Sequence, residues 1–260
     1  MRIAEQEAVE GVAAGVPFVA LPPAGGDAPA ALVVGWHLME VPSSEQAFAE
    51  AAPMSGLPAW RVYFGLPLTG SRLPAGGPAE LFRLASEDAV LNVFGPVTAQ
   101  AAAEFPAALA ELRDRLPGAT GPLGVFGGSA GSLVALEVLT RGDVAVEAAA
   151  VVSPVAQLAP VIGRNERLFD ITYPWTPESR EVAGHYDFVR RAGELTTPLL
   201  LVTGADDDVA VREPAAALRD ALGAELVTVE GMAHEFAPGS AAAKQVDAAF
   251  TEWFARRLRS

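Results

Sequence analysis

The sequence predicts an α/β fold in which helices flank a mostly parallel sheet. Short, nearly continuous apolar runs recur along the 260 residues, as is typical of strands buried on both faces of a parallel sheet. Amphipathic helical patterns alternate with these runs, which indicates right-handed crossover connections. Because no repeat and no linker divides the chain, we expect a single domain over residues 1–260.

The expected elements follow from these patterns in order along the chain. An early antiparallel strand is predicted at Val16–Leu21, before a Pro- and Gly-rich turn. The other predicted strands lie at residues 31–36, 61–64, 123–126, 148–152, 198–202 and 225–229. The predicted helices lie at residues 98–116, 133–139, 214–222 and 241–258.

One segment is longer than a simple crossover requires. Residues 154–196 separate two predicted strands and are rich in aromatic residues and prolines, including Tyr173-Pro174-Trp175. Such a stretch is expected to form a small cap rather than a structureless loop. Its aromatic residues either contact an apolar part of a substrate or form the core of the cap itself. Trp175 and His185 are therefore candidate substrate-lining residues.

Composition excludes several classes of function. The formal net charge is −14 and the isoelectric point is about 4.6, which disfavours binding to nucleic acid or to anionic membranes. The absence of cysteine excludes disulfides, thiol nucleophiles and zinc–thiolate sites, and three histidines are too few for most multi-histidine metal sites. Residues 1–7 lack the pattern of a secretory signal, and no apolar run approaches a bilayer span of about 20 residues. The expected location is cytoplasmic.

The strongest motif is Gly127-Gly128-Ser129-Ala130-Gly131, which fits the G-x-S-x-G pattern of a nucleophile turn. It follows a predicted strand directly and opens a predicted helix. Such a turn strains the serine backbone and brings Gly127 and Gly131 too close together for side chains. The helix N-terminus directs free N–H groups toward the place where an oxyanion would form. The alternative is a simple Gly-rich turn or a phosphate-binding loop, although the lysine of a P-loop is missing.

A serine hydroxyl needs a general base, and the base needs a carboxylate to orient it. His234 follows the last predicted strand, and we expect it at the same sheet edge as Ser129. Asp206, Asp207 and Asp208 follow the preceding strand, and their spacing from Gly204 favours Asp207. The neighbouring aspartates would then form a solvated turn that caps the next helix.

Together, the Gly-Gly-Ser-Ala-Gly turn, Gly204-Ala-Asp-Asp and Gly231-Met-Ala-His resemble the α/β-hydrolase family in spacing and order. The resemblance extends from about Ala31 to the C-terminus. It implies an eight-stranded, mostly parallel sheet, a Ser129-Asp207-His234 triad and no cofactor or metal. It also implies an oxyanion hole with the Ala130 N–H as one donor.

The second oxyanion donor is less clearly defined by the resemblance. The segment after Leu32 is similar to the family element that ends in His-Gly, with His37 at the histidine and Leu38 where glycine is usual. The donor would then be the N–H of Met39 or, as the less favoured alternative, of Leu38. His37 fits a structural role better than a catalytic one, and it is kept as a candidate substrate-lining residue.

These residues predict a serine hydrolase that cleaves a carboxylic ester through an acyl-enzyme. The expected partner is a small-molecule acyl substrate. An acyltransferase, thioesterase, lactonase or peptidase would use the same triad, so these alternatives stay open. A protein of this fold that binds ligands without catalysis is a further alternative, but the presence of every triad residue argues against it.

Overall fold

In the computed structural model, which describes residues 8–25 and 29–258, eight strands form one sheet. The order across the sheet is β1-β2-β4-β3-β5-β6-β7-β8. The strands are β1 (Val9–Ala13), β2 (Val16–Leu21), β3 (Ala31–Trp36), β4 (Ala59–Phe64), β5 (Leu123–Gly128), β6 (Ala148–Val152), β7 (Leu199–Gly204) and β8 (Glu225–Val229). Strand β2 pairs antiparallel with β1 and β4, and all other pairings are parallel. The predicted eight-stranded, mostly parallel sheet is therefore confirmed.

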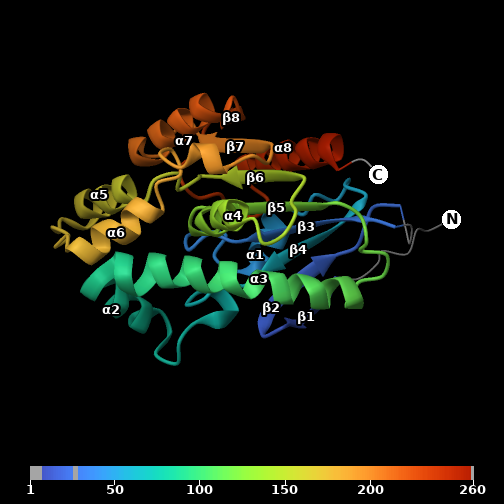
Figure 1. The fold of residues 1–260 in the computed structure, drawn as a ribbon, viewed down its shortest axis with the longest axis horizontal. Coiled ribbons are helices and arrows are strands. Elements are labelled where there is room, and N and C mark those ends of the chain that lie inside the picture. Colours follow the sequence, from blue (N-terminus) through green and yellow to red (C-terminus); the bar gives the residue numbers. More distant parts are fainter. Residues whose placement is uncertain (1–7, 26–28, 259–260) are drawn as a thin grey trace.

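Helices cover both faces of this sheet (Figure 1). They are α1 (Glu45–Ala51), α2 (Gly77–Ala89), α3 (Gly95–Arg115), α4 (Ala130–Arg141), α5 (Leu158–Phe169), α6 (Pro177–His185), α7 (Val209–Leu222) and α8 (Ala241–Arg257), with short turns η1 (Gly70–Arg72), η2 (Val90–Phe94) and η3 (Ala192–Glu194). Apolar side chains of α1 and α8 pack on one face, and those of α3 and α4 pack on the other. The central strands are buried on both faces, as their continuous apolar runs predict.

Two parts of the fold differ from the sequence expectation. Strand β1 is absent from the predicted elements. Most of its residues are exposed, and Glu10 and Gly11 separate its two valines, so it has no continuous apolar run. The predicted helix at 98–116 begins earlier, at Gly95, and is preceded by α2 and the π-helical turn η2. Helix α2 contains no fully buried residue, and Leu81, Leu84 and Ala85 are only partly buried against the core.

Helices α5 and α6 and turn η3 lie in the segment between β6 and β7, where a cap was predicted. They project beyond the end of the sheet at which β5 meets α4, at the left in Figure 1. Tyr173, Tyr186 and Phe188 of this segment are buried and belong to the same apolar cluster as the residues of α3 and α4, so these aromatic side chains attach the segment to the body of the fold.

The structure bears on one of the two expectations about location, the absence of a membrane span, and not on the absence of a secretory signal. Residues 1–7, which lack a secretory pattern in the sequence, lie outside the described residues. Among the residues that the structure describes, no helix combines the length and the apolar character needed to cross a membrane.

Candidate active site

The turn between β5 and α4 holds Ser129 in a strained backbone conformation, with φ of 45° and ψ of −116°. A Cβ added to Gly127 would lie 2.2 Å from the carbonyl oxygen of Gly131. A Cβ added to Gly131 would lie 2.1 Å from the carbonyl oxygen of Trp36. The two glycines therefore allow the close backbone approach that exposes the serine at the end of the sheet.

Replacing Gly131 with alanine is expected to lower the free energy of unfolding by about 3 to 5 kcal/mol, because the new methyl group overlaps backbone that cannot rotate away. Thermal unfolding monitored by circular dichroism should show a fall in Tm of about 10 °C. Gly193→Ala is the matched control, since a Cβ there meets no atom within 4 Å. Equal melting temperatures for the two variants would show that the backbone approach is not as tight as described.

His234 and Asp207 lie next to Ser129 at the same edge of the sheet. The Ser129 Oγ is 2.8 Å from Nε2 of His234. Both carboxylate oxygens of Asp207 lie 3.1 Å from Nδ1 of His234. All three residues are buried. The structure thus brings together the serine, the imidazole and the carboxylate that the sequence singled out, in a hydrogen-bonded chain.

The two neighbouring aspartates make other contacts. The Asp208 side chain accepts a hydrogen bond from the Ala210 N–H at the start of α7 and pairs with Arg167 at 3.0 Å. Asp206 is exposed. Asp207, which its spacing from Gly204 favours, is therefore the one aspartate of the three that contacts His234 in the described structure.

The loop that carries His234 is tied to two other strands. The Ser153 hydroxyl, just after β6, donates a hydrogen bond of 2.7 Å to the His234 carbonyl. A Cβ added to Gly204, the last residue of β7, would lie 2.0 Å from the Met232 carbonyl oxygen. The position of the imidazole therefore depends on the ends of β6 and β7 as well as on β8.

Glu40 is a site residue that the sequence reasoning missed. Its Oε2 accepts a hydrogen bond of 3.1 Å from the Ser129 hydroxyl and lies 3.7 Å from Nε2 of His234. Glu40 directly follows Met39 in the loop after β3. Its adjacency to the expected oxyanion donor was the one available signal, but a single acidic residue in a chain with 32 acidic residues does not stand out.

Opposing effects act on the pKa of His234. Burial and the positive charge of Arg164 favour the neutral imidazole and lower the pKa, but the hydrogen bond to Asp207 and the negative charges of Glu40 and Asp207 favour the imidazolium. The carboxylates prevail, and the pKa of His234 is raised above its ordinary value of about 6.5.

A raised pKa of His234 predicts where activity is lost in acid. A general base must be neutral, so the acid limb of kcat/KM should fall at a pH above that of an ordinary histidine. In Glu40→Gln the imidazolium loses one stabilising charge, and the limb should move to lower pH. Rates for an uncharged ester over pH 5 to 9 test this. A limb that stays in place or moves upward would show that Glu40 does not act on His234.

The predicted oxyanion donors lie beside Ser129. Ala130 is the first residue of α4, and Met39 and Leu38 lie in the loop after β3. Across residues 8–25 and 29–258, no hydrogen bond is found from the backbone N–H of Ala130, Met39 or Leu38. The Leu38 side chain is buried against Gly128, where a Cβ would lie 2.1 Å from it. Both alternatives for the second donor therefore stay predictions.

His37, a candidate substrate-lining residue, is fully buried and does not line the cavity beside His234. Its Nδ1 donates to the Leu38 carbonyl at 2.6 Å, and its Nε2 accepts from the Leu66 N–H at 3.1 Å. Burial is the main cause that lowers the pKa of His37 to about 4. A neutral ring with its proton on Nδ1 satisfies both bonds and fixes the loop that leads to Met39.

Trp175 and His185 also do not line the cavity beside His234. Trp175 packs edge-on against Tyr173, with ring centroids 4.7 Å apart. Nε2 of His185 pairs with the Glu137 carboxylate on α4 at 3.1 Å. Both side chains therefore hold the inserted segment together or against the body of the fold, and a role for them in lining a substrate site stays a prediction.

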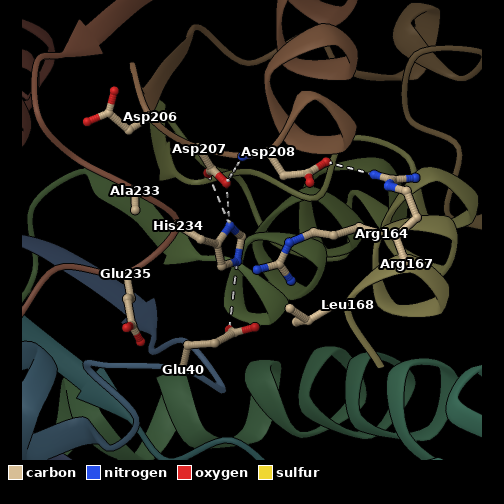
Figure 2. Close-up of a pocket in the computed structure, with 10 residues that line it drawn as sticks. All are labelled: Glu40, Arg164, Arg167, Leu168, Asp206, Asp207, Asp208, Ala233, His234 and Glu235. Carbon is tan, nitrogen blue, oxygen red and sulfur yellow. Dashed lines mark hydrogen bonds and ion pairs between the residues drawn. The ribbon is translucent and has the colours of Figure 1, made fainter. Parts of the chain in front are cut away.

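A cavity of about 560 Å³ opens beside His234 (Figure 2). The residues lining it are Glu40, Arg164, Arg167, Leu168, Asp206, Asp207, Asp208, Ala233, His234 and Glu235. Figure 2 shows the Arg164 guanidinium directed toward the His234 ring, with Glu40 and Asp207 on opposite sides of that ring. Helix α5 thus supplies Arg164, Arg167 and Leu168 from the predicted cap, but not its aromatic residues.

Within residues 8–25 and 29–258, no group of three or more histidine, cysteine, aspartate or glutamate residues is arranged to hold a metal ion. The expected absence of a cofactor stays a prediction.

Solved structures with the same fold include hydrolases of different kinds. A puromycin-hydrolyzing peptidase of Mycobacterium tuberculosis gives a TM-score of 0.69 at 19% identity, over 99% of this chain and 40% of that one. Puromycin hydrolase gives 0.67 at 20% identity, over 96% and 39%. A cold-adapted esterase from an Arctic intertidal metagenomic library gives 0.62 at 19% identity, over 97% and 93%. At these identities the likeness concerns the fold, and it confirms the predicted α/β-hydrolase architecture.

Comparison of the sequences gives the family. No curated protein matches the chain. The chain spans 39% of the length of puromycin hydrolase, so it corresponds to only part of that protein. The family model of the prolyl oligopeptidase family, peptidase S9, matches residues 99–260, a stretch that includes Ser129, Asp207 and His234. Since this match covers more than half of the chain, the protein belongs to the prolyl oligopeptidase family.

Proposed function

We propose that this protein is a serine hydrolase that cleaves a carboxylic ester, or a related acyl bond, of a small molecule. The observation that carries the proposal is the hydrogen-bonded chain from the Ser129 hydroxyl through His234 to Asp207, with distances of 2.8 and 3.1 Å. Such a chain at a strained strand-to-helix turn is the arrangement that activates a serine. Membership of the peptidase S9 family supports the same reaction class.

In the proposed first step, His234 Nε2 takes the proton of Ser129 as the Oγ attacks the acyl carbon. Asp207 accepts from Nδ1–H, which keeps the ring in the required tautomer and stabilises the imidazolium. The N–H groups of Ala130 and of Met39 or Leu38 would stabilise the oxyanion. The imidazolium then protonates the leaving oxygen or nitrogen as the acyl-enzyme forms. Water, deprotonated by His234, cleaves the acyl-enzyme and regenerates Ser129.

Peptide-bond cleavage is the second candidate. The family description and the puromycin-hydrolyzing peptidase favour it, whereas the cold-adapted esterase favours ester cleavage. The same triad serves both reactions, which differ in the leaving group that the imidazolium must protonate. An amide leaving group requires more help from that acid, so amide substrates give the stricter test of peptidase activity.

Labelling with a fluorophosphonate probe, combined with hydrolysis of p-nitrophenyl esters of varied acyl length and of amino acid p-nitroanilides, tests the proposal. We expect the wild-type protein to label and to hydrolyse at least one ester. Anilide cleavage with comparable kcat/KM would assign the peptidase function instead. If the protein neither labels nor hydrolyses any substrate, the hydrolase proposal fails and a non-catalytic binding role gains support.

A further inference from the structure

Glu40 places a negative charge beside the nucleophile. Its Oε2 lies 3.1 Å from the Ser129 Oγ, and its side chain is 37% exposed to the cavity. No arginine or lysine of the described residues forms an ion pair with Glu40. The acyl-transfer steps do not require a carboxylate in contact with the serine hydroxyl, and although the charge of Glu40 favours the imidazolium of His234, it repels an oxyanion that forms nearby. Its position calls for an explanation in terms of the substrate.

Glu40 also competes for the proton of the nucleophile. The Ser129 hydroxyl has one proton and two acceptors, Nε2 of His234 at 2.8 Å and Oε2 of Glu40 at 3.1 Å. Whenever the hydroxyl donates to Glu40, it is turned away from its base. A cation that pairs with Glu40 would engage the carboxylate and leave the proton to His234. Such a cation would therefore improve turnover as well as binding.

Covalent geometry indicates where a substrate can carry this cation. When Ser129 Oγ bonds to the acyl carbon, a nitrogen on the adjacent carbon is two further bonds away, each about 1.5 Å long. That nitrogen therefore lies within a few ångströms of Oγ, as Oε2 of Glu40 does (Figure 2 shows Glu40 next to His234). A protonated amine at this position can form a charge-assisted hydrogen bond with Glu40.

The remaining charges of the cavity favour a cation too. Five carboxylates and two guanidinium groups line it. Arg167 is paired with Asp208, and Asp207 faces His234. Three lining carboxylates remain, those of Glu40, Asp206 and Glu235, and the one remaining lining guanidinium is that of Arg164. In the described structure, Arg164 forms no ion pair with any of the three. The resulting negative potential raises the local concentration of cationic ligands.

We propose that Glu40 selects substrates whose acyl group carries a protonated amine on the carbon next to the scissile carbonyl, that is, aminoacyl esters or amides. This inference rests on the proposed hydrolase function and names its substrate class. Arg164, by contrast, would attract an acyl group with a carboxylate. Such a group would bring its charge toward Glu40, the residue in contact with the nucleophile, so the anionic class is disfavoured.

Three ethyl esters that differ in charge near the reacting carbon test this inference. They are alanine ethyl ester, N-acetylalanine ethyl ester and N-succinylalanine ethyl ester, followed in a pH-stat at pH 7, where most α-amines are protonated. We expect wild-type kcat/KM to be about tenfold to a hundredfold higher for the amine than for the acetylated ester. In Glu40→Gln this ratio should fall to near one. Because the ratio compares two substrates on one protein, a general loss of folded enzyme does not change it.

Glu230→Gln is the matched control, since it removes the same charge from an exposed position that does not line the cavity. Its ratio should stay within about twofold of wild type. A ratio that Glu40→Gln leaves unchanged, or a wild-type preference for the succinylated ester, would overturn the inference. If wild-type kcat/KM is the same for the acetylated ester and for the amine, the inference fails while the hydrolase proposal stands. If no ester is hydrolysed and fluorophosphonate does not label Ser129, the hydrolase proposal fails and the inference falls with it.

Discussion

Replacing Ser129 with alanine is expected to lower kcat/KM for the preferred ester by about five to six orders of magnitude and to abolish fluorophosphonate labelling. The hydroxyl supplies the atom that bonds to the acyl carbon, and neither His234 nor Asp207 can take its place. The fold should survive, because alanine fits the space of serine at this turn. Steady-state hydrolysis and mass spectrometry of the labelled protein measure the two effects.

Ser86→Ala is the control for this experiment, since Ser86 is exposed on α2 and bonds only to the Phe82 carbonyl among the described contacts. It should retain full labelling and activity. Continued labelling of Ser129→Ala at a single site would show that another residue is the nucleophile. Retained hydrolysis without labelling would point to a mechanism without an acyl-enzyme.

Replacing Asp207 with asparagine should lower kcat by about ten-thousandfold, with little change in KM. Asparagine can donate its amide N–H to Nδ1 of His234, which favours the tautomer that has its proton on Nε2 and cannot accept from Ser129. The buried carboxylate that stabilises the imidazolium is lost in the same change.

The two adjacent aspartates provide a built-in comparison. Asp206→Asn changes an exposed side chain, and Asp208→Asn weakens a helix cap and a surface ion pair. Each should change kcat by less than about tenfold, since such contacts contribute on the order of 1 kcal/mol. A larger loss for Asp206→Asn or Asp208→Asn than for Asp207→Asn would reassign the acidic member of the triad.

The sequence predicts the central strands of the fold and the three residues Ser129, Asp207 and His234. Strands β3 to β7 are buried on both faces, so burial alone determines their composition and their apolar runs identify them. Ser129, Asp207 and His234 each follow one of the parallel strands, and the carboxyl ends of parallel strands meet at one edge. The position of each residue directly after a strand is therefore enough to predict that the three lie close together.

Other parts depended on contacts that no local pattern encodes. Strand β1 lies at the edge of the sheet and is mostly exposed, so it lacks an apolar run. Glu40 and Arg164 are single charged residues in a loop and on a helix, and only tertiary structure places them beside His234. His185 and Trp175 show the same limit. Their position in the inserted segment favours a substrate-lining role, whereas the partners that the structure gives them are Glu137 and Tyr173.

The division of the site between the sheet and the inserted segment has a consequence for how this protein can change. Ser129, Asp207 and His234 are held by strand ends whose glycines and Ser153 leave little freedom. Arg164, Arg167 and Leu168 are carried by α5, whose outer residues are exposed. Substitutions in α5 can therefore change the lining of the cavity without displacing the strand ends that hold Ser129, Asp207 and His234.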